Sequence, residues 1–330
     1  MNSPFPKSSS ADGEGRIVVR LLPQGVSGIE TFIYQYPLKL VTPVSPSEAN
    51  KSVLVFLLSY GGGLVGGDKV NLSIDVKPGS RLSLATQGHT KIFKSTSPEI
   101  VTRQTMRVNI AAGAAVCLLP DPVQPFKNSV YEQIQIFRLA RNSSLCLLDW
   151  VTQGRTALGE NWSFVKWVGR NEVWTVADDQ VARDRLLVRD SVILDSNRAH
   201  PELPMLRESM HGVGVTGTLV LRGPLMKSLG EFFLAEFATL PRLGARNWKS
   251  DNVEEETDAL LSPREKWQAG RRRMEKESKL LWSAANVRGC VVVKFGAPVV
   301  EAARLWIGSM LAQEGSISQH FGEQALLCVR

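Results

Sequence analysis

Hydrophobic and polar residues alternate along much of the chain between Ile17 and about Leu194. Residues 72–76, with the sequence LSIDV, are a clear example, because every second side chain is hydrophobic and these side chains share one face of a strand. Turns rich in Gly, Pro, Asn and Ser separate such runs, as in proteins built from consecutive strands. The pattern therefore predicts a mainly β fold.

A weak internal repeat lies within this β-rich region. Each unit consists of an alternating strand, a tight turn and a second, more hydrophobic strand, and the unit returns about every 30 residues. The three units cover residues 72–86, 106–119 and 134–148. Stacked units of this kind bury one continuous core. We predict a stacked β-hairpin, β-helix-like scaffold, and an ordinary β-sandwich is the alternative that the same pattern allows.

The pattern changes after His200, where hydrophobic residues recur at spacings of three and four. Residues 224–240 and 298–313 show this spacing, which predicts two amphipathic helices in the C-terminal part. Residues 242–279 between them are highly charged and contain the runs EEE and RRR. We predict that this stretch is an exposed, partly helical insertion. The alternative is a basic binding module, in which residues 271–273 bind an acidic partner or nucleic acid.

Composition adds a moderately basic charge, with a net charge of +7 and a pI near 9.3. Lys and Arg are spread along the chain without a nucleic-acid-binding motif, so we expect no nucleic-acid partner. There is no secretory signal, membrane span or C-x-x-C pair, which predicts a cytoplasmic protein with reduced thiols. Cys117 and Cys146 fall at matching places in their repeat units and are predicted to be packing residues. Residues 1–16 are predicted to be disordered, and 17–330 to form a single domain.

Five glycines lie within seven positions directly after the apolar run 53–58, and they are Gly61, Gly62, Gly63, Gly66 and Gly67. Three of them satisfy the dinucleotide pattern G-x-G-x-x-G, but such a loop must open a helix. A strand pattern follows here instead. Asp68 also stands where a Walker A motif needs lysine. The motif therefore predicts a tight turn between two strands rather than a phosphate site.

Carboxylates are the main candidates for chemistry, because the chain lacks a metal-binding histidine pair and a G-x-S-x-G nucleophile motif. Asp149 and Glu160 flank a predicted loop, and two nearby carboxylates can act as acid and base or bind a cation. A cation-assisted hydrolase is thus one hypothesis. The alternative is that they form ion pairs with Arg155 and Lys166. His89 lies in a polar turn and is predicted to be a surface residue or a transient metal ligand.

Several segments together resemble one family, the UreD-type urease accessory proteins, which are also called UreH. The resemblance covers roughly residues 17–330 apart from the charged insertion. The segments that carry it are the glycine motif at 59–68, TQ and TKIFK within 86–94, LPDP with PF and Ser within 119–129, GR and GE with Trp and Phe within 154–164, and the strand and amphipathic helix after 289. Five ordered segments are far more specific than one glycine loop.

The resemblance implies a non-enzymatic chaperone of urease maturation with a β-helix-like fold and two helices. Such proteins bind a UreF-type partner, which recruits a UreG-type GTPase, and they dock on apo-urease to assist nickel delivery. The resemblance implies no tightly bound cofactor, only nickel in transit past weak polar ligands. Asp68, Asp149 and Glu160 are the candidate ligands, since carboxylates can bind and release a divalent cation.

Overall fold

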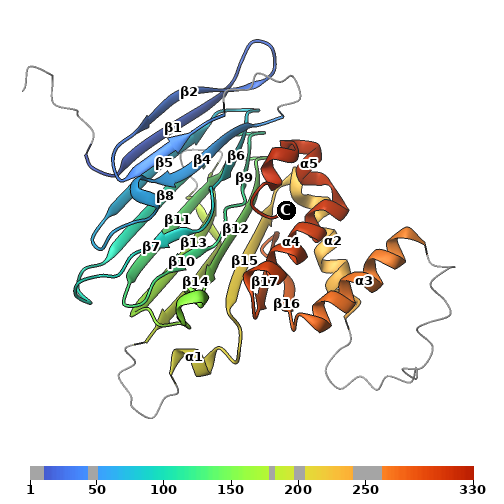
Figure 1. Cartoon of the computed structure of the whole chain (residues 1–330). Coiled ribbons are helices and arrows are strands. Elements are labelled where there is room, and N and C mark those ends of the chain that lie inside the picture. Colours follow the sequence, from blue (N-terminus) through green and yellow to red (C-terminus); the bar gives the residue numbers. More distant parts are fainter. Residues whose placement is uncertain (1–10, 44–50, 178–182, 197–204, 241–261) are drawn as a thin grey trace, which may run out of the picture.

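The computed structural model describes residues 11–43, 51–177, 183–196, 205–240 and 262–330. These residues form two packed β-sheets, and a layer of helices covers the outer face of one sheet (Figure 1). The prediction of a mainly β chain with a few helices in its C-terminal part is confirmed. Within the described ranges, no helix is long and apolar enough to cross a membrane.

Sheet A has seven strands in the order β14-β13-β11-β8-β5-β1-β2. Its neighbouring strands from β1 to β13 are parallel, while β2 and β14 pair antiparallel at the two edges. The strands are β1 (Glu14–Leu21), β2 (Ser27–Tyr34), β5 (Lys69–Val76), β8 (Thr102–Ile110), β11 (Val130–Leu139), β13 (Lys166–Thr175) and β14 (Arg185–Asp195).

Sheet B runs in the order β16-β17-β15-β12-β9-β6-β4-β3, and the short strands β7 and β10 join it beside β12. The strands are β3 (Leu38–Val41), β4 (Val53–Ser59), β6 (Arg81–Ala85), β7 (Thr90–Ile92), β9 (Ala115–Leu118), β10 (Val123–Pro125), β12 (Ser144–Thr152), β15 (Val215–Arg222), β16 (Leu281–Val287) and β17 (Cys290–Ala297).

The α-helices are α1 (Leu206–Ser209), α2 (Lys227–Ala238), α3 (Pro263–Glu277), α4 (Val300–Glu314) and α5 (Ser316–Phe321). Short 3₁₀ turns lie at Tyr60–Gly62, Thr156–Leu158, Pro224–Met226 and Glu323–Leu326. Helices α2 and α4 are the two predicted from hydrophobic spacing. Helix α5 was not predicted, because six residues are too few to show a helical period.

The predicted repeat is visible in the strand register. Each unit places its first strand in sheet A and its second in sheet B, and equivalent residues pair as parallel neighbours. Met106 pairs with Leu72 on one side and with Gln135 on the other, while Val116 lies between Leu82 and Leu145. The finer β-helix-like description is not confirmed, because antiparallel strands flank the stack on both sheets.

The turn within each repeat unit needs one residue with a left-handed backbone. Gly79, Gly113 and Asn142 occupy this position with φ values of 72°, 67° and 56°. Glycine and asparagine adopt this conformation at the lowest cost among common residues. The same local geometry is therefore used three times to lead the chain from sheet A to sheet B.

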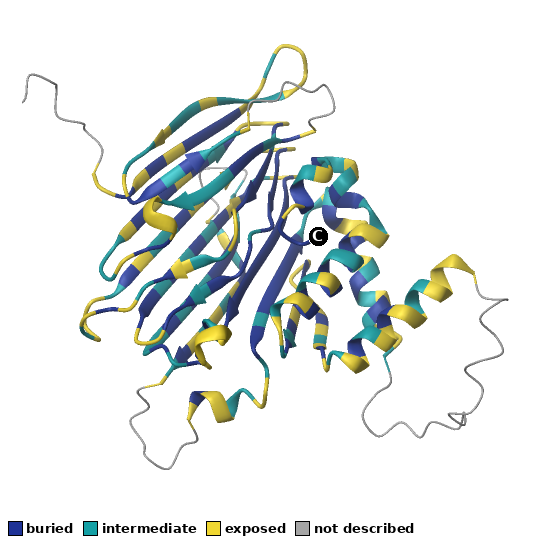
Figure 2. Cartoon of the chain, in the orientation of Figure 1, coloured by how far each residue is buried: buried dark blue, intermediate teal, exposed yellow. Residues whose placement is uncertain are grey.

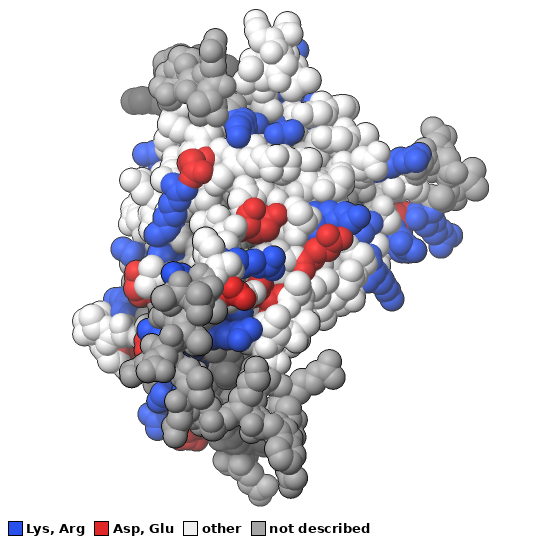
Figure 3. Space-filling view, turned by 90° about the vertical axis from the view of Figure 1, so that its right-hand side faces the viewer, with Lys and Arg blue, Asp and Glu red and all other residues white. Residues whose placement is uncertain are grey.

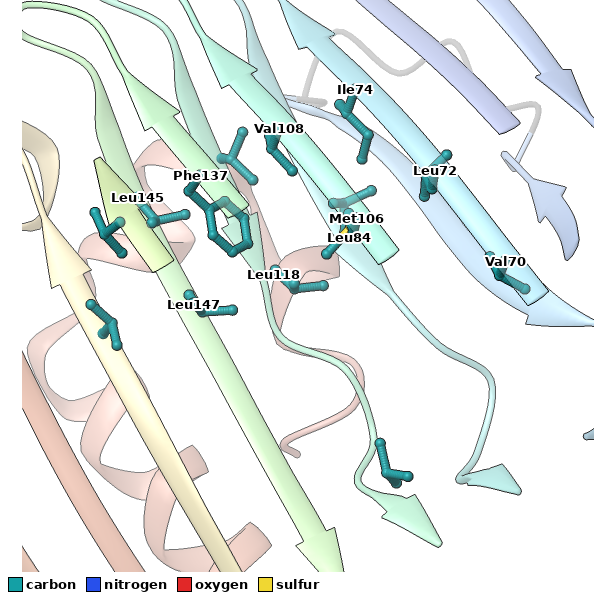
Figure 4. Close-up of a cluster of buried hydrophobic side chains, with 14 of the residues drawn as sticks. Val70, Leu72, Ile74, Leu84, Met106, Val108, Leu118, Phe137, Leu145 and Leu147 are labelled. Carbon is teal, nitrogen blue, oxygen red and sulfur yellow. The ribbon is translucent and has the colours of Figure 1, made fainter. Parts of the chain in front are cut away.

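The hydrophobic core is divided between two interfaces. One lies between the sheets, and residues such as Leu72, Met106 and Phe137 from sheet A face Leu84 and Leu118 from sheet B there (Figure 4). The other lies between sheet B and the helices. Figure 2 shows that the central strands of sheet B, β6, β9, β12 and β15, are buried along most of their length, as expected for strands covered on both faces.

Cys117 and Cys146 lie in the second interface and are register partners on β9 and β12. Both are buried, as predicted from the repeat, and burial raises the pKa of the Cys117 thiol well above its usual value. These thiols therefore contribute apolar packing.

Two predicted boundaries need correction. The N-terminal segment predicted to be disordered to residue 16 is ordered from β1 onward, and residues 1–10 lie outside the described part. The glycine-rich composition of this segment suggested disorder, but Gly13 has a structural role. It has φ 76°, and a Cβ atom there would come within 1.7 Å of the Lys69 carbonyl oxygen. Its missing side chain allows close packing.

The charged insertion at 242–279 is the second correction. Residues 241–261 lie outside the described part of the chain, but α3 is a capped helix that begins after Ser262. Most α3 residues are exposed as expected, whereas Arg271 and Glu275 are buried. The reason is that these two side chains form ion pairs against the helical layer rather than facing solvent.

Candidate functional site

A polar cavity of about 280 Å³ lies between the two sheets. Hydrophobic residues form part of its wall, including Leu57, Leu72 and Met106. Its polar wall comes from several separate chain segments and includes Thr86, His89, Gln104, Asp121, Gln133, Gln135 and Asp149. Buried polar groups are costly unless they are hydrogen-bonded, so such a cavity inside a β-sandwich is a candidate functional site.

Asp149 is the central carboxylate of this cavity. It lies on β12 and points between the sheets, where its Oδ1 accepts a hydrogen bond from Gln133 Nε2 at 2.9 Å. Its Oδ2 accepts one from Asn171 Nδ2 at 2.6 Å. Burial raises the pKa of Asp149 to about 6, although both amide hydrogen bonds favour the ionised form. The side chain therefore changes charge close to physiological pH.

Asp149 also lines a second, smaller cavity of about 40 Å³. Lys294 and Asp190 line the same space and are 2.5 Å apart between Nζ and Oδ1. A space of this size holds about one water molecule. Asp149 thus belongs to the walls of both cavities.

Asp121 is a second carboxylate in the wall of the larger cavity, and it holds several polar groups around it. It was not among the candidate residues predicted from the sequence. Its Oδ2 accepts hydrogen bonds from Thr86 Oγ1 at 3.1 Å and from Gly88 N at 2.9 Å. Its Oδ1 lies 2.8 Å from Arg304 Nη2 on α4. The only local signal was its place in the LPDP segment, because Arg304 is distant in sequence.

His89 lies next to this group and is partly buried in the cavity wall. Burial lowers its pKa, while the negative charge of Asp121 acts in the opposite direction. His89 is thus partly exposed and partly in the cavity wall, so its two predicted roles, surface residue and transient metal ligand, both stay predictions. A neutral imidazole at this place can donate or accept a hydrogen bond, or act as a nitrogen ligand.

The glycine motif connects the sheets. It leads from β4 in sheet B to β5 in sheet A, so a strand follows it and the argument against a dinucleotide loop is confirmed. Gly61, Gly62 and Gly67 have φ values of 71°, 73° and 92°, which favour glycine. Gly62 also lines the inter-sheet cavity.

The other two glycines allow close backbone approach. A Cβ atom at Gly63 would lie 2.9 Å from the Lys91 carbonyl oxygen, and one at Gly66 would lie 3.1 Å from Ser95 Cα. The motif therefore packs tightly against β7 and the segment that follows it. All five glycines have a steric or conformational reason to be glycine.

Asp68 closes this turn. Its Oδ2 accepts a hydrogen bond from Val65 N at 2.7 Å, and its own N–H bonds to the Val65 carbonyl at 3.0 Å. Thr102 Oγ1 further ties the loop by accepting from Gly67 N and donating to the Val65 carbonyl. Asp68 is not among the residues that line either cavity.

Gly62→Val is expected to lower the free energy of unfolding by about 2 kcal/mol, because a β-branched residue is strained at positive φ. No atom lies within 4 Å of the added Cβ position, so the effect isolates backbone strain from a clash. Urea denaturation of the full chain measures it. Gly62→Asn is the matched control and should cost far less, since asparagine tolerates this conformation. Equal losses for both variants would contradict the strain argument.

Glu160 forms the ion pair that was the alternative to a catalytic or metal role. It pairs with Arg155, and its carboxylate also accepts hydrogen bonds from Arg155 N at 2.8 Å and Lys127 N at 3.2 Å. Burial acts to raise its pKa, but these donors outweigh it and lower the pKa. Lys166 pairs instead with Asp195 at 3.2 Å. The observed contacts of Glu160 hold the loop after β12.

The three candidate carboxylates differ in whether they line a cavity. Asp149 lines both cavities, whereas Asp68 and Glu160 line neither. Among the described residues, no three His, Cys, Asp or Glu side chains are grouped so that they could hold a metal ion. The hydrolase hypothesis needed Asp149 and Glu160 in one pocket, and this geometry argues against it.

The basic-module hypothesis fails at Arg271, whose side chain is 0% exposed. Its guanidinium contacts Glu236 at 3.0 Å and Glu275 at 2.5 Å, so it is paired inside the protein. On the side of the molecule seen in Figure 3, basic and acidic side chains are mixed and separated by uncharged surface. Arg272 and Arg273 remain exposed, but two side chains do not make a nucleic-acid interface.

Comparison with known proteins agrees with the resemblance seen in the sequence. A family model described as UreD urease accessory protein matches residues 11–328. An uncharacterized urease accessory protein ureD-like of Schizosaccharomyces pombe is 31% identical over 310 residues, which covers 94% of this chain and 97% of the relative. Urease accessory protein UreD of Sorangium cellulosum is 35% identical over 223 residues, covering 68% and 65%. Urease accessory protein D of Arabidopsis thaliana is 30% identical over 216 residues, covering 65% and 69%.

Proposed function

The chain belongs to the UreD family of urease accessory proteins, and on that premise we propose that it is a non-catalytic scaffold for urease maturation. In this proposal it joins a UreF-type protein to apo-urease and assists the delivery of nickel. A UreG-type GTPase joins through the UreF-type partner. The glycine motif supports this assignment of GTP hydrolysis to the UreG-type partner, because it is a turn between two strands and does not open a helix as a nucleotide-binding loop does.

One observation carries the nickel part of the proposal. Asp149 is a buried carboxylate that faces two polar cavities, and its pKa of about 6 leaves it largely ionised at neutral pH. A lone buried negative charge is unfavourable, and a divalent cation beside it would relieve that cost.

A cation that passes through a protein needs ligands that release it. One carboxylate with nearby amide and hydroxyl oxygens offers a weak site, unlike a closed set of four nitrogen or sulfur ligands. The amide groups of Gln133 and Gln135 and the carboxylate of Asp121 line the same cavity as Asp149. We therefore propose Asp149 as the central transient ligand for nickel. Asp68 and Glu160 line neither cavity, and we propose them only as additional transient ligands in their loops.

Deletion of the gene tests this function. We expect the deletion strain to contain urease protein with little bound nickel, since apo-urease would lack its delivery complex. Metal analysis of the purified urease measures the nickel, and re-expression of the chain should restore it. A tagged chain should also capture the UreF-type protein of its own organism. Urease with full nickel occupancy in the deletion strain would overturn the proposal.

A further inference from the structure

Among the described residues, no helix covers the outer face of sheet A, although such sheets usually have one. Its strands from β1 to β13 are parallel neighbours, and parallel sheets are normally covered on both faces. Helices α2, α3, α4 and α5 all lie on the side of sheet B (Figure 1). In the described part of the chain, the outward surface of sheet A carries charged and polar side chains together with some apolar ones.

A hollow of about 470 Å³ lies on this face, and we call it the outer-face hollow. Arg16, Arg107 and Arg138 line it from three different strands, while Ile136 and Trp174 add apolar surface. The lining residues come from strands that lie side by side in sheet A, so the sheet itself fixes their spacing. The hollow thus combines several guanidinium groups with an aromatic ring.

The charges of the hollow favour a negative partner. Its two acids are already paired, Asp75 with Arg16 and Glu172 with Arg189. Glu172 is only 8% exposed, while the Arg189 side chain above it is 52% exposed. Arg107 is exposed and forms no ion pair with any described residue. The positive groups therefore reach further toward solvent than the negative ones.

We propose that the outer-face hollow is a docking site for an acidic protein segment, in which carboxylates flank an apolar or aromatic side chain. A carboxylate pairs with Arg107, because Arg16 and Arg138 already form ion pairs with Asp75 and Asp184. The apolar side chain packs on Trp174 and Ile136. Arg and Trp are the residue types that contribute most to protein interfaces. A nucleic acid fits less well, because binding along a phosphate backbone takes several free basic groups, and among the arginines that line the hollow only Arg107 has no ion pair with a described residue.

The identity of the partner rests on the proposed function, which makes apo-urease and the UreF-type protein the two proteins to test. Each is purified from the same organism, and its affinity for the wild-type chain and for Arg107→Glu is measured by surface plasmon resonance. We expect Arg107→Glu to weaken binding of one of them by about tenfold or more, and Arg107→Gln by less. Binding of the wild type should also weaken as salt is raised.

Arg272→Glu is the matched control, because it makes the same charge reversal on an exposed position of α3. Circular dichroism and thermal unfolding confirm that each variant is folded. Unchanged binding of both proteins to Arg107→Glu would overturn this inference, as would an equal loss for Arg272→Glu. Binding of a single-stranded DNA oligonucleotide that depends on Arg107 would also overturn it, since the partner class would be wrong.

The two proposals fail in different ways. If the wild-type chain binds its partners and activates urease while Arg107→Glu behaves identically, the docking site alone is wrong. If the wild-type chain binds neither protein and its deletion leaves urease with full nickel, the scaffold function fails and the docking site fails with it.

Discussion

Arg271→Ala is expected to lower the free energy of unfolding by about 3–5 kcal/mol, the cost of breaking a buried ion pair by removing one partner. Arg271 lies between Glu236 on α2 and Glu275 on its own helix, and we call these three residues the Arg271 cluster. The side chains of the two glutamates are 1% and 8% exposed. Without the guanidinium, Glu275 would lose its ion pair and Glu236 would keep only Arg264, whose side chain is 62% exposed.

The surroundings of the Arg271 cluster explain why solvent cannot replace the lost charge. Trp306 Nε1 donates a hydrogen bond to Glu275 at 2.8 Å, and Gln268 Nε2 donates one to Glu236 at 2.7 Å. The rings of Trp267 and Trp282 lie 5.6 and 5.7 Å from the Arg271 guanidinium. These contacts hold α3 against the rest of the helical layer.

Urea denaturation followed by circular dichroism measures the effect. Arg273→Ala is the control, because it removes the same side chain from an exposed position two residues away, and its expected change is below about 0.5 kcal/mol. A loss below about 1 kcal/mol for Arg271→Ala would contradict the prediction. Loss of Arg271 together with Glu236→Gln should be less damaging than the single change, since one uncompensated charge is removed.

Asp149→Asn is expected to change the pH dependence of stability and to impair function. From pH 4 to pH 8 the stability of the variant relative to the wild type should rise by about 1–3 kcal/mol, because asparagine avoids a buried negative charge whose pKa is raised to about 6. Its amide has one acceptor oxygen for the two donors Gln133 and Asn171, so the variant also loses one hydrogen bond at every pH. Urease activation should nevertheless become several times slower, since the proposed transient ligand for nickel has lost its charge.

The pH dependence follows from the direction of the pKa shift. Between about pH 4, where a free aspartate titrates, and about pH 6, the folded wild type holds the Asp149 proton more tightly than the unfolded chain does. The wild type therefore loses stability as the pH rises through this window. The pH-dependent gain of Asp149→Asn should be complete above about pH 6 and should vanish near pH 4, where only the cost of the lost hydrogen bond remains.

Thermal unfolding of both proteins from pH 4 to pH 8 measures this difference, and nickel analysis of urease from cells that express each variant measures the function. Glu132→Gln is the control, because Glu132 is a carboxylate on the outer face of sheet A that pairs with Arg103. Normal urease activation by Asp149→Asn would exclude Asp149 as a nickel ligand. A stability difference that does not change with pH would contradict the raised pKa.

The alternating strands and the repeat could be predicted because each depends on neighbouring residues. The period of two in residues 72–76 already determines which side chains of β5 face the core. The turn residues Gly79 and Gly113 also indicate the repeat, because each can be recognised from the few residues around it. The stacking of the units then follows, since equivalent strands pair side by side.

The site could be predicted only in part, because its walls come from residues far apart in sequence. Asp149 was recognised as a candidate, but its partners Gln133 and Asn171 lie on sheet A and no local pattern links them to it. The burial of Arg271 was missed for the same reason. A run of three arginines indicates an exposed face, and its partner Glu236 is 35 residues away on another helix.

The contact between Asp121 and Arg304 has a consequence for the order in which the protein forms during synthesis. The two residues are separated by 183 positions. At about 5–20 residues per second, a ribosome reaches Arg304 roughly 10–40 s after Asp121. The nascent chain can therefore pair the repeat strands well before it has the guanidinium that fixes Asp121 beside Thr86 and Gly88. The polar cavity is thus completed late, after the sheets around it have had time to assemble.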